Sequence, residues 1–106
     1  MSDREEVILQ KIKNVIKNND PTAEVILYGS HARGTAHHDS DWDILILLNK
    51  KNIPIQIEQK FRHSLLDIEL EIGEVISVLV YAKKDWQGKL RITPFYENIN
   101  HEGIVL

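Results

Sequence analysis

Two adjacent segments decide the fold of this chain: LYGSHARG at residues 27–34 and DSDWDILILL at residues 39–48. The first is a short apolar run that stops at Gly29-Ser30, which is typical of a strand that turns directly into a helix. Glycine lets an anion approach the backbone because it has no Cβ atom. The N–H groups and the Ser30 hydroxyl then face that anion at the start of the helix. A simple helix cap by Ser30 is the alternative interpretation.

The second segment places two carboxylates, Asp41 and Asp43, two residues apart at the start of a strand. Side chains with this spacing point to the same side of a strand. Two close carboxylates repel each other unless a cation lies between them, and Mg²⁺ binds to one or two protein carboxylates together with substrate phosphates. A solvated turn is the alternative. However, Asp43 leads directly into an apolar strand, where a charge needs a compensating partner.

The combined pattern, Gly-Ser-x-Ala-Arg-Gly and then Asp-x-Asp before an apolar strand, covers residues 27–48. It resembles the minimal nucleotidyltransferase domains of the DNA polymerase beta-like nucleotidyltransferase superfamily. The resemblance implies a small mixed β-sheet flanked by helices. It also implies transfer of a nucleoside monophosphate from a nucleoside triphosphate, for which we expect ATP, with Mg²⁺ as cofactor and release of pyrophosphate.

The same resemblance assigns roles to individual residues. Gly29 and Ser30 would hold the triphosphate, and Asp41 and Asp43 would bind the metal, as a two-metal site in an active enzyme. Arg33 belongs to the motif and would support the loop or contact a phosphate. An ion pair with Asp39 or Asp41 is the alternative for this arginine.

Active members of the superfamily usually carry a third carboxylate on a later strand, where it can act as a general base. The strand expected to supply it, residues 75–81, has Ser77 as its only central polar residue. A hydroxyl cannot replace a carboxylate at neutral pH. Glu74 is the nearest acid, and a solvated residue at the start of the strand is the alternative interpretation. Both Ser77 and Glu74 are therefore candidates for the third position.

Three classes of function follow from these observations. The first is transfer of a nucleoside monophosphate to a hydroxyl of a protein or a small molecule. The second is a catalytically weak antitoxin or partner-binding module, and a purely structural subunit is a third class. Related domains are often encoded beside a HEPN-domain protein, so the resemblance implies such a partner, with a homo-oligomer as a further alternative.

The rest of the chain predicts a single α/β (α+β) domain over residues 1–106, because apolar residues alternate between helical and strand periodicity. The predicted stops include Gly73 and Gly103. We expect helices at residues 5–18, 55–72 and 94–100, strands at 24–28, 42–48 and 75–81, and a helical turn at 83–90.

Composition and the remaining motifs narrow the function further. The net charge of −3 argues weakly against a nucleic-acid-coating role. No cysteine and no long apolar run are present, which fits a cytoplasmic protein without a membrane span. The loop histidines, His31, His37 and His38, are interpreted as solvated rather than as a zinc site. The larger aromatic residues are expected to pack in the core, namely Trp42, Trp86, Phe95 and Tyr96.

Overall fold

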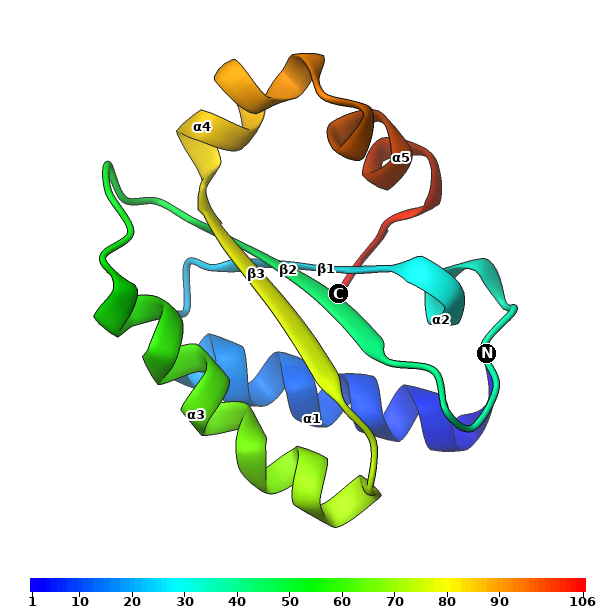
Figure 1. Cartoon of the computed structure of the whole chain (residues 1–106). Helices are drawn as coiled ribbons and strands as arrows, with labels where there is room; N and C mark the ends of the chain where they lie inside the picture. Colours follow the sequence, from blue (N-terminus) through cyan, green and yellow to red (C-terminus); the bar gives the residue numbers. More distant parts are fainter.

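The computed structural model describes all residues from 1 to 106 and contains helices on both sides of one sheet (Figure 1). The elements follow one another as α1 (Asp3–Asn19), β1 (Glu24–Tyr28), α2 (Gly29–Arg33), β2 (Trp42–Leu48), α3 (Ile55–Ile72), β3 (Ile76–Ala82), α4 (Lys83–Gln87), the 3-10 helix η1 (Lys89–Ile92), α5 (Pro94–Glu102) and β4 (Ile104–Val105). The chain therefore has the mixed α and β fold that the sequence predicts.

The sheet is mixed and has the strand order β3-β2-β1-β4. Strands β1 and β2 are antiparallel, as are β1 and β4, whereas β2 and β3 run parallel. Strand β2 lies inside the sheet between β1 and β3, and every residue from Ile44 to Leu48 is buried. A strand covered on both faces should be continuously apolar, and this explains the run ILILL.

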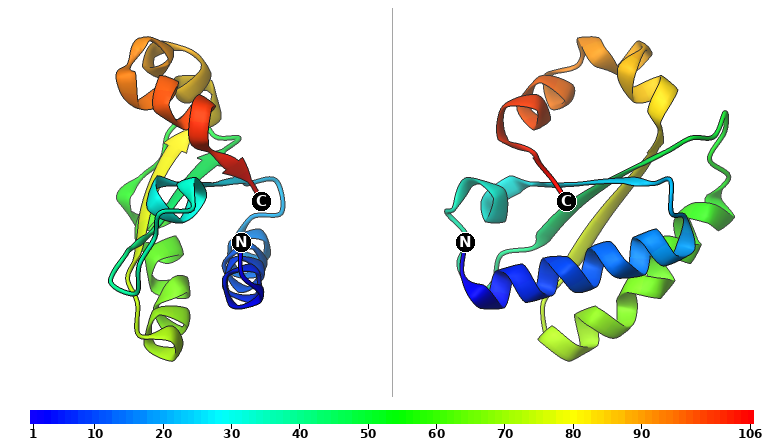
Figure 2. Two further views of the ribbon diagram at one scale, coloured as in Figure 1. Left: turned by 90° about the vertical axis from the view of Figure 1, so that its right-hand side faces the viewer. Right: turned by 180° about the vertical axis from the view of Figure 1, so that it is seen from behind.

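The structure has three layers, with the sheet between two layers of helices (Figures 1 and 2). Helices α1 and α3 cover one face of the sheet, where the larger cluster of buried residues lies. Helices α4 and α5 cover part of the other face through a smaller cluster that includes Leu45, Leu47 and Trp86. Because side chains alternate along β2, Asp43 shares the second face with Leu45, and Trp42 points into the first.

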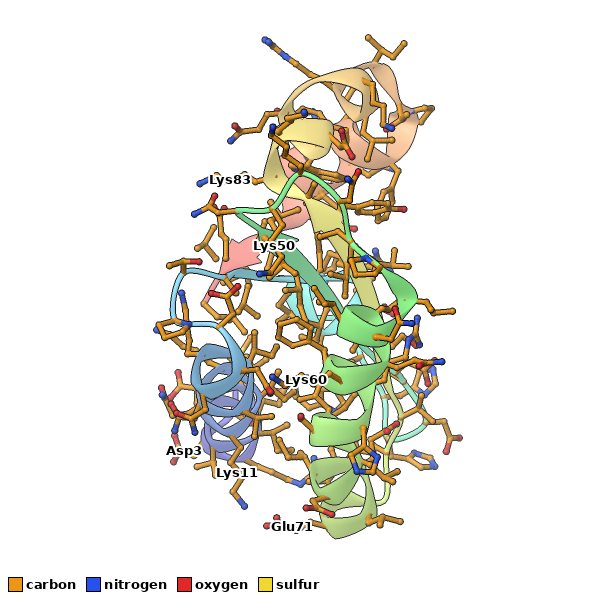
Figure 3. The ribbon with its side chains drawn as sticks, turned by 90° about the vertical axis from the view of Figure 1, so that its left-hand side faces the viewer. Asp3, Lys11, Lys50, Lys60, Glu71 and Lys83 are labelled. Carbon is orange, nitrogen blue, oxygen red and sulfur yellow. The ribbon has the colours of Figure 1, made fainter.

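Local sequence determines the ends of the two long helices. Ser2 and Glu5 form a capping box at the start of α1, which satisfies two backbone donors. Gly73 ends α3 with φ +70°, a left-handed conformation that favours glycine. Lys11, in the middle of α1, and Glu71, near the end of α3, form an ion pair between the two helices, and Figure 3 shows both side chains at the bottom of the view.

The prediction was accurate for the long elements and incomplete at the C-terminus. The third strand begins at Ile76 rather than at residue 75, and the turn predicted at 83–90 divides into α4 and η1. Thr93 caps α5 with Pro94 at its first turn. Strand β4 was missed, because two residues are too few for any periodicity to be detected. No helix is both long and apolar enough to cross a bilayer.

Candidate functional site

The site is built around Gly29, the residue at which β1 turns into α2. Gly29 has φ +77°, and a Cβ atom added to it would lie 2.1 Å from Oδ2 of Asp43. Asp43 stands beside it because β2 pairs with β1 in a register that sets Asp43 opposite Tyr28. Glycine is thus required here for two reasons: the backbone conformation, and the approach of a carboxylate that any side chain would obstruct.

Ser30 lies within α2 and is half-buried. The N-cap of α2 is Tyr28, and no side chain caps the helix. The alternative that Ser30 acts as a helix cap is therefore wrong. We call Gly29 and Ser30 together the Gly29–Ser30 corner.

The acid pair, Asp41 and Asp43, lies at the start of β2 on the same side of the sheet as the corner. Asp41 is exposed and Asp43 is half-buried. Burial raises the pKa of Asp43, and the charge of Asp41 raises it further, whereas His31 and Arg33 act in the opposite direction. The ionised pair is therefore unfavourable without a positive partner, and two carboxylates that face the same way fit a hard divalent cation.

Tyr28 and Ser77 flank the acid pair on the neighbouring strands. Each is in register with Asp43, Tyr28 on β1 and Ser77 on β3. The Ser77 hydroxyl lies 3.4 Å from Oδ2 of Asp41. Burial, Asp43 and Tyr81 raise the pKa of Tyr28 to about 12, so its phenol stays neutral at physiological pH. Tyr28 and Ser77 both line a surface cavity of about 510 Å³.

The two candidates for a third acidic position lie in different places. Ser77 is beside the acid pair, as the sequence predicts. Glu74 pairs with Arg4 and accepts a hydrogen bond from the Trp42 indole at 3.3 Å. Because Trp42 alternates with Asp41 and Asp43, Glu74 belongs to the opposite face of the sheet. No group of three metal-binding side chains is present in the chain.

Arg33 has a partner that the sequence did not indicate. Its Nη1 lies 2.8 Å from Oε2 of Glu102, the last residue of α5. The other carboxylate oxygen of Glu102 accepts a long hydrogen bond of 3.4 Å from the Gly29 backbone N–H. The expected alternative, an ion pair with Asp39 or Asp41, is therefore wrong. Glu102 was missed because it is 69 residues away from Arg33 in the chain.

His31 is also placed differently from the prediction. It is only 6% exposed and stacks on Trp42, with ring centroids 3.6 Å apart and planes 10° apart. Its Nδ1 lies 3.0 Å from Oε2 of Glu5, and its Nε2 has no partner. The interpretation as a solvated loop histidine is wrong for His31, although His37 and His38 are exposed. His31 thus fixes α2, and with it the corner, against the buried side of β2.

Comparison with known proteins identifies the family. The sequence model of the family described as "Polymerase beta, Nucleotidyltransferase" matches residues 10–105 of the chain. The chain belongs to this family. The nucleotidyltransferase motif therefore lies inside a match that spans almost the whole domain, and the acid pair and the corner fall within it.

Two individual proteins are similar to this nucleotidyltransferase domain. A Methanocaldococcus jannaschii protein, provisionally named a protein adenylyltransferase (MJ1379), is 36% identical over 47 residues, which are 44% of this chain and 47% of the relative. The matched region thus spans about half the length of that relative. A crystal structure of the toxin–antitoxin pair MntA–HpeT, with a mutation, matches at a TM-score of 0.59 and 20% identity, over 92% of this chain and 69% of the other. That likeness concerns the fold alone.

Proposed function

We propose that this domain transfers AMP from ATP to a hydroxyl group of a partner protein, with Mg²⁺ bound by Asp41 and Asp43. The main support for the proposal is the close packing of Asp43 against Gly29. A Cβ atom added to Gly29 would lie 2.1 Å from Oδ2 of Asp43. The proposed metal ligand Asp43 therefore lies directly beside the Gly29 backbone, where no side chain separates it from a bound phosphate. Metal-assisted phosphoryl transfer needs a bound cation next to a bound phosphate.

The choice of ATP and of a protein acceptor is supported by the related proteins. The archaeal relative is named as a protein adenylyltransferase, and the solved structure of similar fold is one half of a toxin–antitoxin pair. A partner protein that supplies the acceptor hydroxyl agrees with both of these names, and a HEPN-type protein is the first candidate.

Each residue of the site has a role in the proposed reaction. Asp41 and Asp43 hold Mg²⁺, which neutralises charge on the phosphates when it is bound. Gly29 and Ser30 bind the triphosphate, and Arg33 contributes a positive charge. The acceptor oxygen attacks the α-phosphorus, the bond from that phosphorus to the bridging oxygen of the β-phosphate breaks, and pyrophosphate leaves. The hydroxyl proton passes to solvent, because the Ser77 hydroxyl is no base at neutral pH.

A second function is favoured by one specific observation. Ser77 lies in register with Asp43 at the place where a third carboxylate would serve as general base, and its hydroxyl is near Asp41. General-base catalysis typically contributes about 10²–10⁴-fold to a rate. The alternative is therefore a nucleotide-binding antitoxin or partner-binding module that turns over slowly.

Two measurements on the same samples test the proposal. Calorimetric titration with ATP, with and without Mg²⁺, measures binding, and ATP labelled at the α-phosphate measures transfer to a co-expressed partner protein. Asp41→Asn and Asp43→Asn should abolish both. Asp39→Asn is the matched control, because Asp39 is an exposed acid close to them whose partner is His38. Tight partner binding without label would favour the second function, and no Mg²⁺-dependent binding would refute both.

A further inference from the structure

The Gly29–Ser30 corner already has an anionic neighbour within the chain. One carboxylate oxygen of Glu102 lies 2.8 Å from the Arg33 guanidinium, and the other accepts from the Gly29 N–H at 3.4 Å. The Glu102 side chain is 21% exposed, compared with 51% for Arg33. Glu102 therefore contacts two of the groups that the proposed function assigns to the triphosphate, namely a backbone donor and a cationic side chain.

The C-terminal segment holds Glu102 in this place. Gly103 ends α5, and its N–H donates to the carbonyl of Ile99 at 2.7 Å. A Cβ on Gly103 would lie 2.5 Å from that carbonyl oxygen and 2.9 Å from Cγ2 of Ile26. Strand β4 then pairs with β1 beside Ile26 and Leu27, and Figure 2 shows the C-terminus returning to this edge of the sheet. Glu102 is thus the last residue before a tight and specific turn.

We propose that Glu102 is an intramolecular ligand of the Gly29–Ser30 corner that the triphosphate must displace, so that the end of α5 sets the nucleotide affinity of the site. The inference rests on the proposed function, because it concerns the same corner. Its physical basis is like-charge exclusion. A carboxylate and a triphosphate cannot share the Gly29 N–H and the Arg33 guanidinium, and each would repel the other at that distance.

The size of the effect follows from competition. If only a fraction of the molecules has the corner open, the apparent dissociation constant increases by the inverse of that fraction. The pair between Arg33 and Glu102 is partly exposed, so its own contribution is modest. Removal of the negative charge should therefore tighten binding of Mg²⁺-ATP by roughly three- to tenfold. The gain should be largest for ATP, smaller for ADP and smallest for AMP, because repulsion increases with phosphate charge.

Calorimetric titration of the wild-type chain, Glu102→Gln and Glu102→Ala with Mg²⁺-bound ATP, ADP and AMP tests this inference. Glu97→Gln is the matched control, because it removes the same charge from an exposed position on the same helix. We expect tighter binding for both Glu102 variants and no change for Glu97→Gln. Urea denaturation of each variant verifies that the domain stays folded at the temperature of the titration.

The results of the titration distinguish a failure of this inference from a failure of the proposed function. If the wild-type chain binds ATP and the Glu102 variants bind it equally or more weakly, the inference is wrong and the proposed function stands. A gain of the same size for ATP, ADP and AMP, or one shared by Glu97→Gln, also refutes competition at the corner. If neither the wild-type chain nor the Glu102 variants bind Mg²⁺-ATP, the proposed function itself fails, and the inference fails with it.

Discussion

Replacement of Gly29 by alanine tests the contact on which the site is built. The new Cβ would lie 2.1 Å from Oδ2 of Asp43, whereas ordinary contacts begin near 3.4 Å, so the carboxylate must retreat by about 1.3 Å, which is 3.4 less 2.1. Gly34 is the matched control. It has almost the same backbone angle, φ +76° against +77°, and no atom within 4 Å of an added Cβ. Both substitutions strain the backbone, but only Gly29→Ala displaces Asp43.

The expected loss of stability is the sum of two contributions. A non-glycine residue in the left-handed region costs about 1–2 kcal/mol, and this is the whole effect expected for Gly34→Ala. Overpacking against Asp43 adds about 1–3 kcal/mol, so Gly29→Ala should lose about 2–5 kcal/mol in total. For a domain of this size, the difference between the two variants corresponds to a gap of about 4–12 °C in Tm.

A double-mutant cycle isolates the contact. Urea denaturation of Gly29→Ala, Asp43→Ala and the combined variant gives their coupling free energy, which should be at least about 1 kcal/mol. Asp43→Ala does not remove the whole clash, because the Cβ atom of residue 43 would still lie 3.2 Å from the new Cβ atom of residue 29. Mn²⁺ binding, followed by electron paramagnetic resonance, should be weakened in Gly29→Ala and retained in Gly34→Ala. Equal losses of stability in the two glycine variants, with no coupling to Asp43, would refute the packing of the corner against the acid pair.

Three further predictions concern the neighbouring residues. Burial raises the pKa of Asp43, and the charge of Asp41 is the second cause. A carboxyl group whose pKa is raised in the folded state destabilises the fold only when the pH exceeds the pKa of the unfolded state, which is near 3.8. Asp43→Asn should therefore raise the Tm at pH 7 but not at pH 3, and a gain of equal size at both values would contradict this assignment. Ser77→Asp should increase the transfer of α-phosphate label on the order of tenfold or more by supplying a general base; unchanged transfer with intact Mg²⁺-ATP binding would show that the base is not what limits the reaction. His31→Ala should destabilise the domain in urea by about 2–4 kcal/mol, and His31→Phe by less than half of that, because phenylalanine keeps the stack on Trp42; equal losses would rule out stacking as the main contribution.

The sequence predicts those parts of the molecule in which local chemistry is sufficient. The bounds of α3 and its stop at Gly73 agree with the prediction residue for residue, because helical periodicity and a left-handed glycine are both local properties. The apolar run of β2 likewise indicated a strand buried on both faces. The prediction of a site at Asp41 and Asp43 rests on equally local information, namely two carboxylates separated by one residue before a strand that is otherwise apolar.

The errors for Arg33 and His31 involve contacts between separate elements of the fold. The partner of Arg33 is Glu102, which reaches the corner only because β4 pairs with β1. His31 looked solvated because its neighbours in the loop are polar, yet α2 turns it onto Trp42. No periodicity or spacing contains this information, because it depends on how β1, β2 and the C-terminal segment are arranged in space.

The site residues come from different strands, so under the proposed function binding and catalysis can be separated. Asp43 lies on β2 in the interior of the sheet, and its position is fixed by pairing with Tyr28 on one side and Ser77 on the other. Ser77 lies on β3, an edge strand of the sheet, and its side chain contributes no charge. A change at this position would alter the group beside the acid pair without moving Asp41 or Asp43. Under the proposed function, turnover could therefore be lost while nucleotide affinity is kept, so binding and transfer have to be measured independently on the same variants.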